Sequence, residues 1–224
     1  MPHTFDRKKP TFLFDLDGTL ADTALDLGHA VNHVRAQKKL AQLPLDSYRP
    51  YASQGARGLL QYGLGLTPED AEFESIKSKF LDFYGQHCCV YTTLFPNIIS
   101  LIHQLRQAQC PWGIVTNKAF AYAQPLVKAL SLDPPVLIGG DSTPFLKPSP
   151  EPLWLACDHL GVRPENAWYI GDDERDILAG KAAGMKTVSI GFGYLAIGAQ
   201  PLAWSADHHC QTVEALMGLI DQTL

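Results

Sequence analysis

The chain has 224 residues, of which 46% are hydrophobic and 18% are charged, and its formal net charge is −5. These values are typical of a globular protein and argue against nucleic acid as a partner, because nucleic-acid binding usually requires a strongly basic surface. Five cysteines without a Cys-x-x-Cys pair favour free thiols in a reducing, cytoplasmic setting, and the absence of any apolar run near the roughly 20 residues of a membrane-spanning helix argues against a membrane partner.

The first predicted element is a short buried strand from Thr11 to Phe14, because this run contains no turn residue and is mainly apolar. Asp15 and Asp17 follow it, and strand alternation lets both carboxylates point the same way from its end. Gly18 then allows the chain to turn away from the sheet. Taken alone, the motif is compatible with a simple metal-binding turn. A magnesium ion would relieve the repulsion between the two acids, and an aspartate can also accept a phosphoryl group.

The next segment, residues 21–90, is predicted to be helical without a convincing strand. Apolar and small residues recur at helical spacing over 21–40, and a shorter helix is predicted over 54–64. A third helix begins with a proline in its first turn and can run over 67–90. We therefore predict a separate α-helical domain for residues 21–90.

Helices and strands are predicted to alternate in the rest of the chain. We expect helices over 96–107, 120–130, 152–160, 176–183 and 213–223, and strands over 112–116, 136–138, 167–170 and 187–190. Such alternation is typical of parallel strands with helices on both faces. The predicted fold is a doubly wound, mostly parallel α/β sheet, formed by residues 1–20 and 91–224, with the helical domain inserted into it.

Polar residues follow several of the predicted strands, at the end where open α/β sheets bind ligands. Thr116-Asn117-Lys118 follows one strand and Gly171-Asp172-Asp173 another, while Lys147 lies in a proline-rich loop before a helix. Phosphoryl transfer depends on positioning and on charge stabilisation of the transferring oxygens. Carboxylates for magnesium, a hydroxyl and backbone amides for phosphate oxygens, and a lysine for positive charge meet that need.

The ordered set of motifs resembles the four motifs of the haloacid dehalogenase superfamily of phosphatases. They are Asp15-x-Asp17-Gly18-Thr19, Thr116-Asn117, Lys147-Pro148 and Gly171-Asp172-Asp173. The match spans nearly the whole chain in the right order. Residues 21–90 also resemble the small helical cap of the phosphoglycolate phosphatase group, and residues 176–185 are similar to that group's sequence after the fourth motif. The resemblance implies a magnesium-dependent phosphatase with a Rossmann-like core and a cap.

The resemblance also implies roles for single residues. Asp15 would be the nucleophile that forms an aspartyl-phosphate, and Asp17 would protonate the leaving group and then activate water. Thr116 and Asn117 would bind the phosphate, and Lys147 would steady Asp15 and the transferring charge.

Further acids would complete the site. The resemblance implies that Asp172 binds magnesium together with Asp15 and the backbone carbonyl of Asp17. Asp173 and Asp176 would orient a magnesium-bound water or the lysine, although the helix dipole alone also favours an acid at a helix start.

The helical domain should choose the leaving group. Its best candidates are Ser53, Gly55 and Arg57, because a glycine turn at a helix start offers free amides, and an arginine suits an anionic or sugar-like group. An arginine on a helix surface is the alternative interpretation. This pattern suits phosphoglycolate, yet it is also similar to that of N-acetylmuramic acid 6-phosphate phosphatases. We therefore expect a small phosphorylated metabolite, with phosphoglycolate first and the sugar phosphate as the alternative.

Other activities share parts of this motif set. A mutase like β-phosphoglucomutase would keep Asp15 and Asp17, whereas a haloalkanoic acid dehalogenase would not need Asp17.

The stretch Gly191-Phe192-Gly193-Tyr194-Leu195-Ala196 matches a loose dinucleotide-binding pattern, but it does not follow the first strand, and Gly198 disfavours a long helix after it. A monomer or a homodimer is expected.

Overall fold

The computed structural model describes residues 4–224, so the first three residues of the predicted core domain lie outside the described part. Its centre is a six-stranded sheet in which every neighbouring pair is parallel, in the order β5-β4-β1-β6-β7-β8. The strands are β1 (Thr11–Phe14), β4 (Trp112–Val115), β5 (Leu137–Ile138), β6 (Ala167–Gly171), β7 (Lys186–Ile190) and β8 (His208–Cys210). The α/β fold predicted from the sequence is thereby confirmed.

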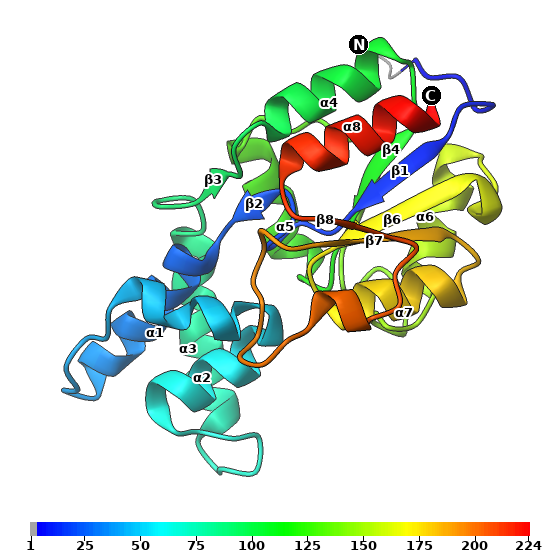
Figure 1. The fold of residues 1–224 in the computed structure, drawn as a ribbon. Helices are drawn as coiled ribbons and strands as arrows, with labels where there is room; N and C mark the ends of the chain where they lie inside the picture. The colour runs from blue at the N-terminus through cyan, green and yellow to red at the C-terminus, as the bar shows by residue number, and fades with distance from the viewer. Residues whose placement is uncertain (1–3) are drawn as a thin grey trace.

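Helices cover both faces of this sheet (Figure 1). They are α4 (Ile98–Gln107), α5 (Phe120–Ala129), α6 (Glu151–Leu160), α7 (Glu174–Ala182) and α8 (Val213–Thr223), with short 3-10 turns at Pro164–Asn166 and Pro201–Ala203. Alternation along β1 separates two cores: Phe12 and Phe14 pack in one core with α4, α5 and α8, and Leu13 packs in the other with α6. Strand β1 is therefore buried on both sides, as its apolar sequence predicts.

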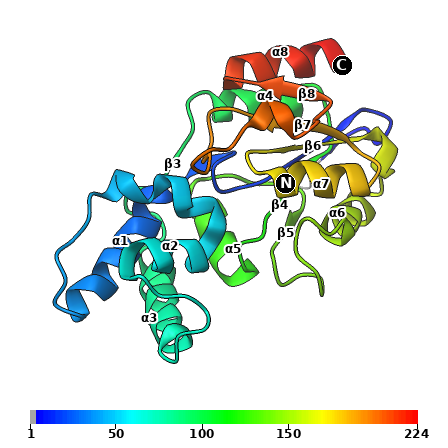
Figure 2. The same cartoon turned by 60° about the horizontal axis from the view of Figure 1, so that its bottom comes forward.

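The remaining helices gather beyond the carboxyl end of β1 (Figures 1 and 2). They are α1 (Ala24–Gln37), the 3-10 helix η1 (Leu45–Gln54), α2 (Gly55–Leu64) and α3 (Phe73–Gln86). We call residues 24–86 the helical segment. Two chain crossings join it to the sheet, and there β2 (Ala21–Asp22) pairs antiparallel with β3 (Thr93–Leu94). The division into two domains stays a prediction.

The structure corrects the prediction that residues 21–90 contain no strand. Ala21 and Asp22 form β2, so the first helix begins only at Ala24. Two residues are too few for a recognisable pattern, and only the pairing with β3 makes them a strand. The third helix is also shorter than predicted, because Asp70 accepts bonds from the N–H and hydroxyl of Thr67 and holds that stretch as a turn.

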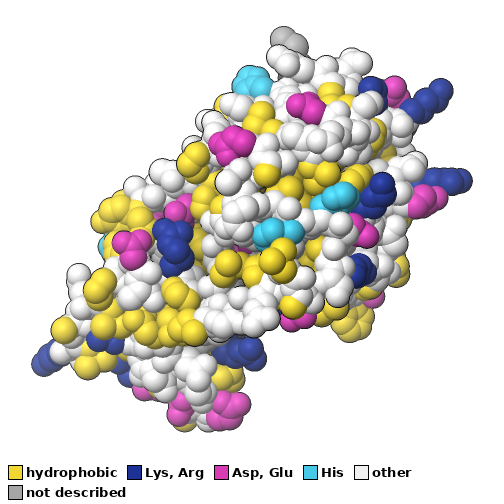
Figure 3. Space-filling view, in the orientation of Figure 1, with side chains coloured by type: hydrophobic (Ala, Val, Ile, Leu, Met, Phe, Trp, Pro, Cys, Tyr) yellow, Lys and Arg dark blue, Asp and Glu magenta, His cyan; other side chains and the backbone are white. Residues whose placement is uncertain are grey.

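Charged groups are spread over the face of the molecule drawn in Figure 3. On the face drawn in Figure 3, Lys and Arg side chains stand apart and form no continuous patch. Within residues 4–224, no helix combines the length and apolar character needed to cross a bilayer.

Candidate active site

A cavity of about 350 Å³ lies between the carboxyl end of the sheet and the helical segment. The sheet side contributes mainly charged and polar groups, among them Asp15, Asp17, Thr116, Asn117, Lys118, Lys147, Asp173, Arg175 and Asp176. The helical segment contributes mainly apolar and aromatic groups, among them Leu27, Ala52, Ala56, Phe80, Leu81 and Tyr84, together with Ser53, Gly55 and Lys77. Residues from all four motifs, or adjacent to them, thus meet at one end of the sheet.

Lys147 is the charged centre of the site and is only 4% exposed. Its Nζ lies 3.0 Å from Oδ1 of Asp15 and 2.7 Å from Oδ1 of Asp176, and it donates to the hydroxyl of Tyr169 at 2.7 Å. Burial alone would lower the pKa of Lys147, but the charges of the two acids raise it above its usual value. The lysine therefore remains a cation between two carboxylates.

Asp15 lies at the end of β1. Its Oδ1 accepts no hydrogen bond within residues 4–224 and forms the ion pair with Lys147. Burial raises the pKa of Asp15 to about 6, Lys147 opposes this rise, and the charges of Asp176 and Asp17 add to it. A pKa of about 6 leaves most of this carboxylate ionised at neutral pH, and Asp15 lines the cavity, as a nucleophile must.

Asp172 is buried beside Asp15 at the end of β6. It accepts from Oγ1 of Thr19 at 3.0 Å and from the backbone N–H of Tyr194 at 2.7 Å. Gly18, with φ +82°, makes this arrangement possible, because a Cβ there would lie 2.1 Å from Oδ2 of Asp172.

Three carboxylates at this point fit a divalent metal ion. Asp15, Asp172 and Asp176 each offer an oxygen within 4.8 Å of the others. Burial raises the pKa of Asp172 well above its usual value, and the neighbouring charges of Asp15 and Asp176 raise it further. A cation would remove this repulsion, and magnesium prefers oxygen ligands. Asp176 is the least available of the three because its oxygens already accept from Lys147 and from the N–H of Asp173.

Asp17 points to a different set of partners. Its Oδ1 accepts from Oγ1 of Thr23 at 2.5 Å and pairs with Nζ of Lys118 at 2.9 Å. Burial would lower the pKa of Lys118, but Asp17 and then Tyr84 raise it, and Nζ lies 4.7 Å from the centre of the Tyr84 ring on α3. No role in the site was predicted for Lys118 from the sequence, although its place directly after Thr116-Asn117 at a strand end was a signal.

Thr116 and Asn117, which follow β4, make different contacts. Thr116 is buried, and its Oγ1 accepts from the N–H of Lys118 at 3.1 Å. The side chain of Asn117 binds the backbone of Lys147 in both directions, donating at 3.0 Å and accepting at 2.9 Å. The side chain of Asn117 therefore holds the lysine loop in place, and its contact with phosphate stays a prediction.

Asp173 and Asp176 form a reciprocal cap at the start of α7. Asp173 also pairs with the guanidinium of Arg175 at 2.8 Å, and although burial would raise the pKa of Asp173, these bonds lower it. Arg175 reaches across the cavity edge and donates to the backbone oxygen of Ser53 in η1. The sequence indicated no role for Arg175.

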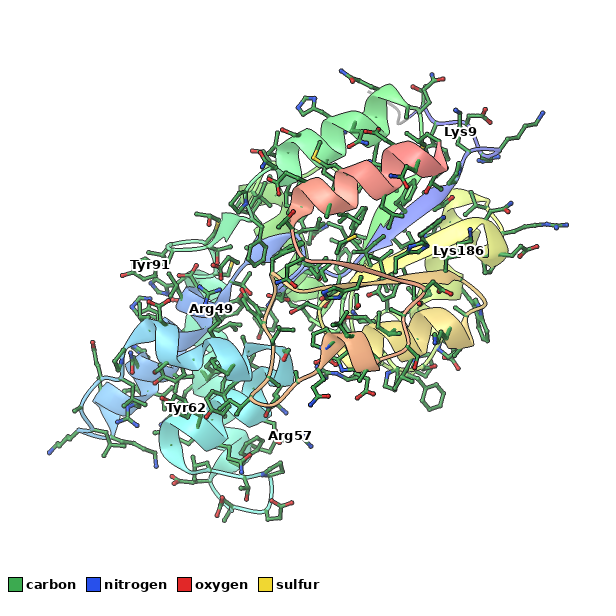
Figure 4. All side chains as sticks on the ribbon, viewed as in Figure 1. Lys9, Arg49, Arg57, Tyr62, Tyr91 and Lys186 are labelled. Carbon is green, nitrogen blue, oxygen red and sulfur yellow. The ribbon has the colours of Figure 1, made fainter. Side chains whose placement is uncertain are left out.

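The predicted residues of the helical segment lie in different places. Ser53 and Gly55 line the cavity, and the buried Oγ of Ser53 has no hydrogen-bond partner within the described chain. Arg57 is exposed and does not line the cavity, and Figure 4 shows it at the outside of α2. The arginine at the cavity is Arg175.

The chain is similar to known proteins over most of its length. A family model described as haloacid dehalogenase-like hydrolase matches residues 12–190. An N-acetylmuramic acid 6-phosphate phosphatase from Pseudomonas aeruginosa is 36% identical over 95% of this chain and 95% of its own length. A phosphoglycolate phosphatase from Xanthomonas campestris is 40% identical over 87% of this chain and 89% of its own. The crystal structure of a predicted phosphoglycolate phosphatase from Haemophilus somnus superposes with a TM-score of 0.83 at 26% identity, covering 95% of this chain and 98% of that one.

Proposed function

The chain belongs to the haloacid dehalogenase-like hydrolase family, and we propose that it is a magnesium-dependent phosphatase that acts through a phosphorylated Asp15. One observation carries the proposal. The carboxylate of Asp15 lies 3.0 Å from the buried ammonium of Lys147 and within 4.8 Å of Asp172. Nucleophile, fixed positive charge and metal acid are thereby assembled at one point, which is what phosphoryl transfer requires.

In the first step, the ionised carboxylate of Asp15 attacks the phosphorus atom of the ester. The bond from phosphorus to the ester oxygen breaks, and Asp17 in its acid form gives a proton to the leaving oxygen. Lys147 and the backbone amides after β4 stabilise the charge on the transferring oxygens, with the hydroxyl of Thr116 as a further donor.

In the second step, Asp17 is a carboxylate and removes a proton from water as the water oxygen attacks the phosphorus. The bond between phosphorus and Asp15 breaks, inorganic phosphate leaves, and Asp17 holds the proton for the next turnover. The ammonium of Lys118, 2.9 Å from Asp17, holds this side chain in place at the cavity. Asp15, Asp172 and the backbone carbonyl of Asp17 would hold magnesium, and the bound ion would supply positive charge to offset the negative charge of the phosphoryl group.

Asp173 and Asp176 are proposed as supporting residues. Because Asp176 accepts from Lys147 at 2.7 Å, its proposed task is to orient that lysine, and Asp173 fixes Asp176 through the shared helix cap.

We propose a small phosphorylated metabolite as the substrate, with phosphoglycolate first. Lys77 and Arg175, both at the cavity, offer cations to its carboxylate. Ser53 and Gly55 remain the proposed contacts on the helical segment, as a cap over the sheet, whereas Arg57, predicted from the sequence, is exposed outside the cavity and is not proposed as a contact. The relative from Xanthomonas campestris that carries this activity in its name supports the proposal.

The size of the cavity favours a second candidate, N-acetylmuramic acid 6-phosphate. A volume of about 350 Å³ with apolar and aromatic walls suits a sugar-sized group, since pockets for ligands of that size start at roughly 300 Å³. The matching relative from Pseudomonas aeruginosa covers 95% of this chain. Five free cysteines support a cytoplasmic location, and a monomer or homodimer stays a prediction.

A phosphate-release panel with magnesium tests the proposal, using 2-phosphoglycolate, N-acetylmuramic acid 6-phosphate, hexose phosphates and an aryl phosphate. Asp15→Asn should abolish release, and Asp158→Asn, which changes an exposed aspartate, is the matched control. A preference of about 100-fold in kcat/KM, about 2.7 kcal/mol, would identify the substrate. Turnover by Asp15→Asn near the wild-type rate would contradict the mechanism, and an isomerised ester in place of phosphate would indicate a mutase.

A further inference from the structure

The loop after β7 contains the stretch Gly191 to Tyr194, which the proposed chemistry does not use. Tyr194 is 1% exposed, and the loop passes beside β2, where the chain leaves the sheet for the helical segment (Figure 1). The backbone N–H of Tyr194 contacts the sheet side of the site, and its phenol contacts the start of the helical segment.

The backbone end of this loop packs on the metal acid. The N–H of Tyr194 donates to Oδ2 of Asp172 at 2.7 Å. A Cβ on Gly193 would lie 2.3 Å from the backbone oxygen of Gly18 and 2.4 Å from Cβ of Asp172. The glycine therefore permits a close approach that a larger residue would prevent, so Tyr194 has a fixed position relative to the catalytic end of β1.

The phenol end binds the start of the helical segment. The phenol oxygen accepts hydrogen bonds from the backbone N–H of Thr23 and from that of Ala24, the latter at 2.9 Å. These N–H groups stand at the start of α1, where the helix offers them no partner. The phenol donates to Oδ1 of Asp22 at 2.9 Å. Burial raises the pKa of Tyr194 above its usual value and the charge of Asp22 raises it further, so the phenol keeps the proton it donates.

Asp22 extends this contact into the helical segment. Both of its oxygens accept from the guanidinium of Arg49 in η1, each at 2.9 Å, and the same guanidinium lies 5.6 Å from the centre of the Tyr194 ring. Figure 4 shows Arg49 where the helical segment meets β2. The second connection between the helical segment and the sheet also contacts Tyr194, because the centre of the Phe95 ring lies 6.4 Å from the centre of the Tyr194 ring.

We propose that Tyr194 is a positioning residue that fixes the helical segment over the catalytic end of the sheet, through its phenol and the Asp22–Arg49 pair. Ser53 and Gly55 follow Arg49 in the same stretch of chain, so the distance between these cavity residues and Asp15 depends on this contact. The kinetic part of this inference rests on the proposed phosphatase activity, whereas the structural part does not.

Tyr194→Phe removes only the phenol oxygen and leaves the backbone bond to Asp172. We expect KM for the best substrate of the release panel to rise at least about 10-fold, because the leaving group contacts the helical segment. The inhibition constant of inorganic phosphate, which needs only the sheet side, should stay within about threefold. Thr187→Val is the matched control. It removes a buried hydroxyl on β7, the strand before the Tyr194 loop, where that hydroxyl donates to Asp207 at 2.8 Å, and it should change neither constant.

Amide hydrogen exchange tests the position without relying on activity. In Tyr194→Phe, exchange at Thr23 and Ala24 and throughout η1 should become at least about 10-fold faster, and Thr187→Val should leave these amides unchanged. Unchanged exchange in η1 would overturn the proposal, as would a parallel rise of KM and the phosphate inhibition constant. If Tyr194→Phe does not fold, Asp22→Asn must give the same separation of the two constants, and its absence overturns the proposal. Failure of the wild type to release phosphate would reject the phosphatase and leave the exchange result as the test.

Discussion

Replacing Gly18 by alanine should damage catalysis far more than stability. The new Cβ would lie 2.1 Å from Oδ2 of Asp172 and 2.7 Å from its Cγ, closer than any real Cβ contact, so this carboxylate must move by about 1 Å or more. A misplacement of that size in a catalytic group can cost about 100-fold, or about 2.7 kcal/mol of transition-state stabilisation. The positive φ of +82° adds about 1 to 2 kcal/mol of backbone strain.

Gly184→Ala separates these two effects. Gly184 has φ +78°, and no atom lies within 4 Å of the position that a Cβ would occupy there, so this variant carries the strain without the collision. Phosphate release and thermal unfolding should be measured for both variants over a range of magnesium concentrations. Both should lose a few degrees in Tm, but only Gly18→Ala should lose about 100-fold in kcat/KM and need more magnesium for half-maximal rate. Activity of Gly18→Ala within threefold of Gly184→Ala would refute the argument.

Three further predictions concern charged residues of the cavity. Lys147→Met should lower kcat at least about 1,000-fold, because it removes the cation 3.0 Å from Asp15, and steady-state kinetics with circular dichroism as a folding check would test this. With a chelator present, thermal stability should fall as pH rises from about 4 to about 6.5. The pKa of Asp15 is about 6 in the folded state and 3.8 in the unfolded state, so the folded state binds more protons in this range. The free energy of unfolding should fall by at most about 3 kcal/mol. Magnesium at pH 7 should restore that stability. If Tm instead rises with pH, and rises equally in the wild type and in Asp172→Asn, the acid cluster does not cause the pH dependence. Arg175→Met should raise KM at least about 10-fold and Arg57→Ala less than threefold, because Arg175 lines the cavity and Arg57 is exposed outside it; the reverse order would restore Arg57 as the substrate arginine.

Local sequence patterns predicted most strands of the sheet and the places where those strands end. Thr11–Phe14 is apolar on both faces of a strand, and the alternation after residue 96 is typical of parallel strands, so β1, β4, β6 and β7 could be predicted from local pattern. The rule that ligands bind at the carboxyl ends of such strands then placed Asp15, Asp172 and Thr116 at a common edge. These predictions succeed because each depends only on neighbours a few residues away.

Three short strands and several side-chain contacts could not be predicted from local sequence. β2, β3 and β8 have two or three residues each, and such runs become strands only through the partner that completes their hydrogen bonds. The same holds for the contact of Lys118 with Tyr84, and for the phenol of Tyr194, whose partner Ala24 lies 170 residues away in the chain. No periodic pattern records such distant pairs, because the burial and charge that make them favourable exist only once the chain has folded.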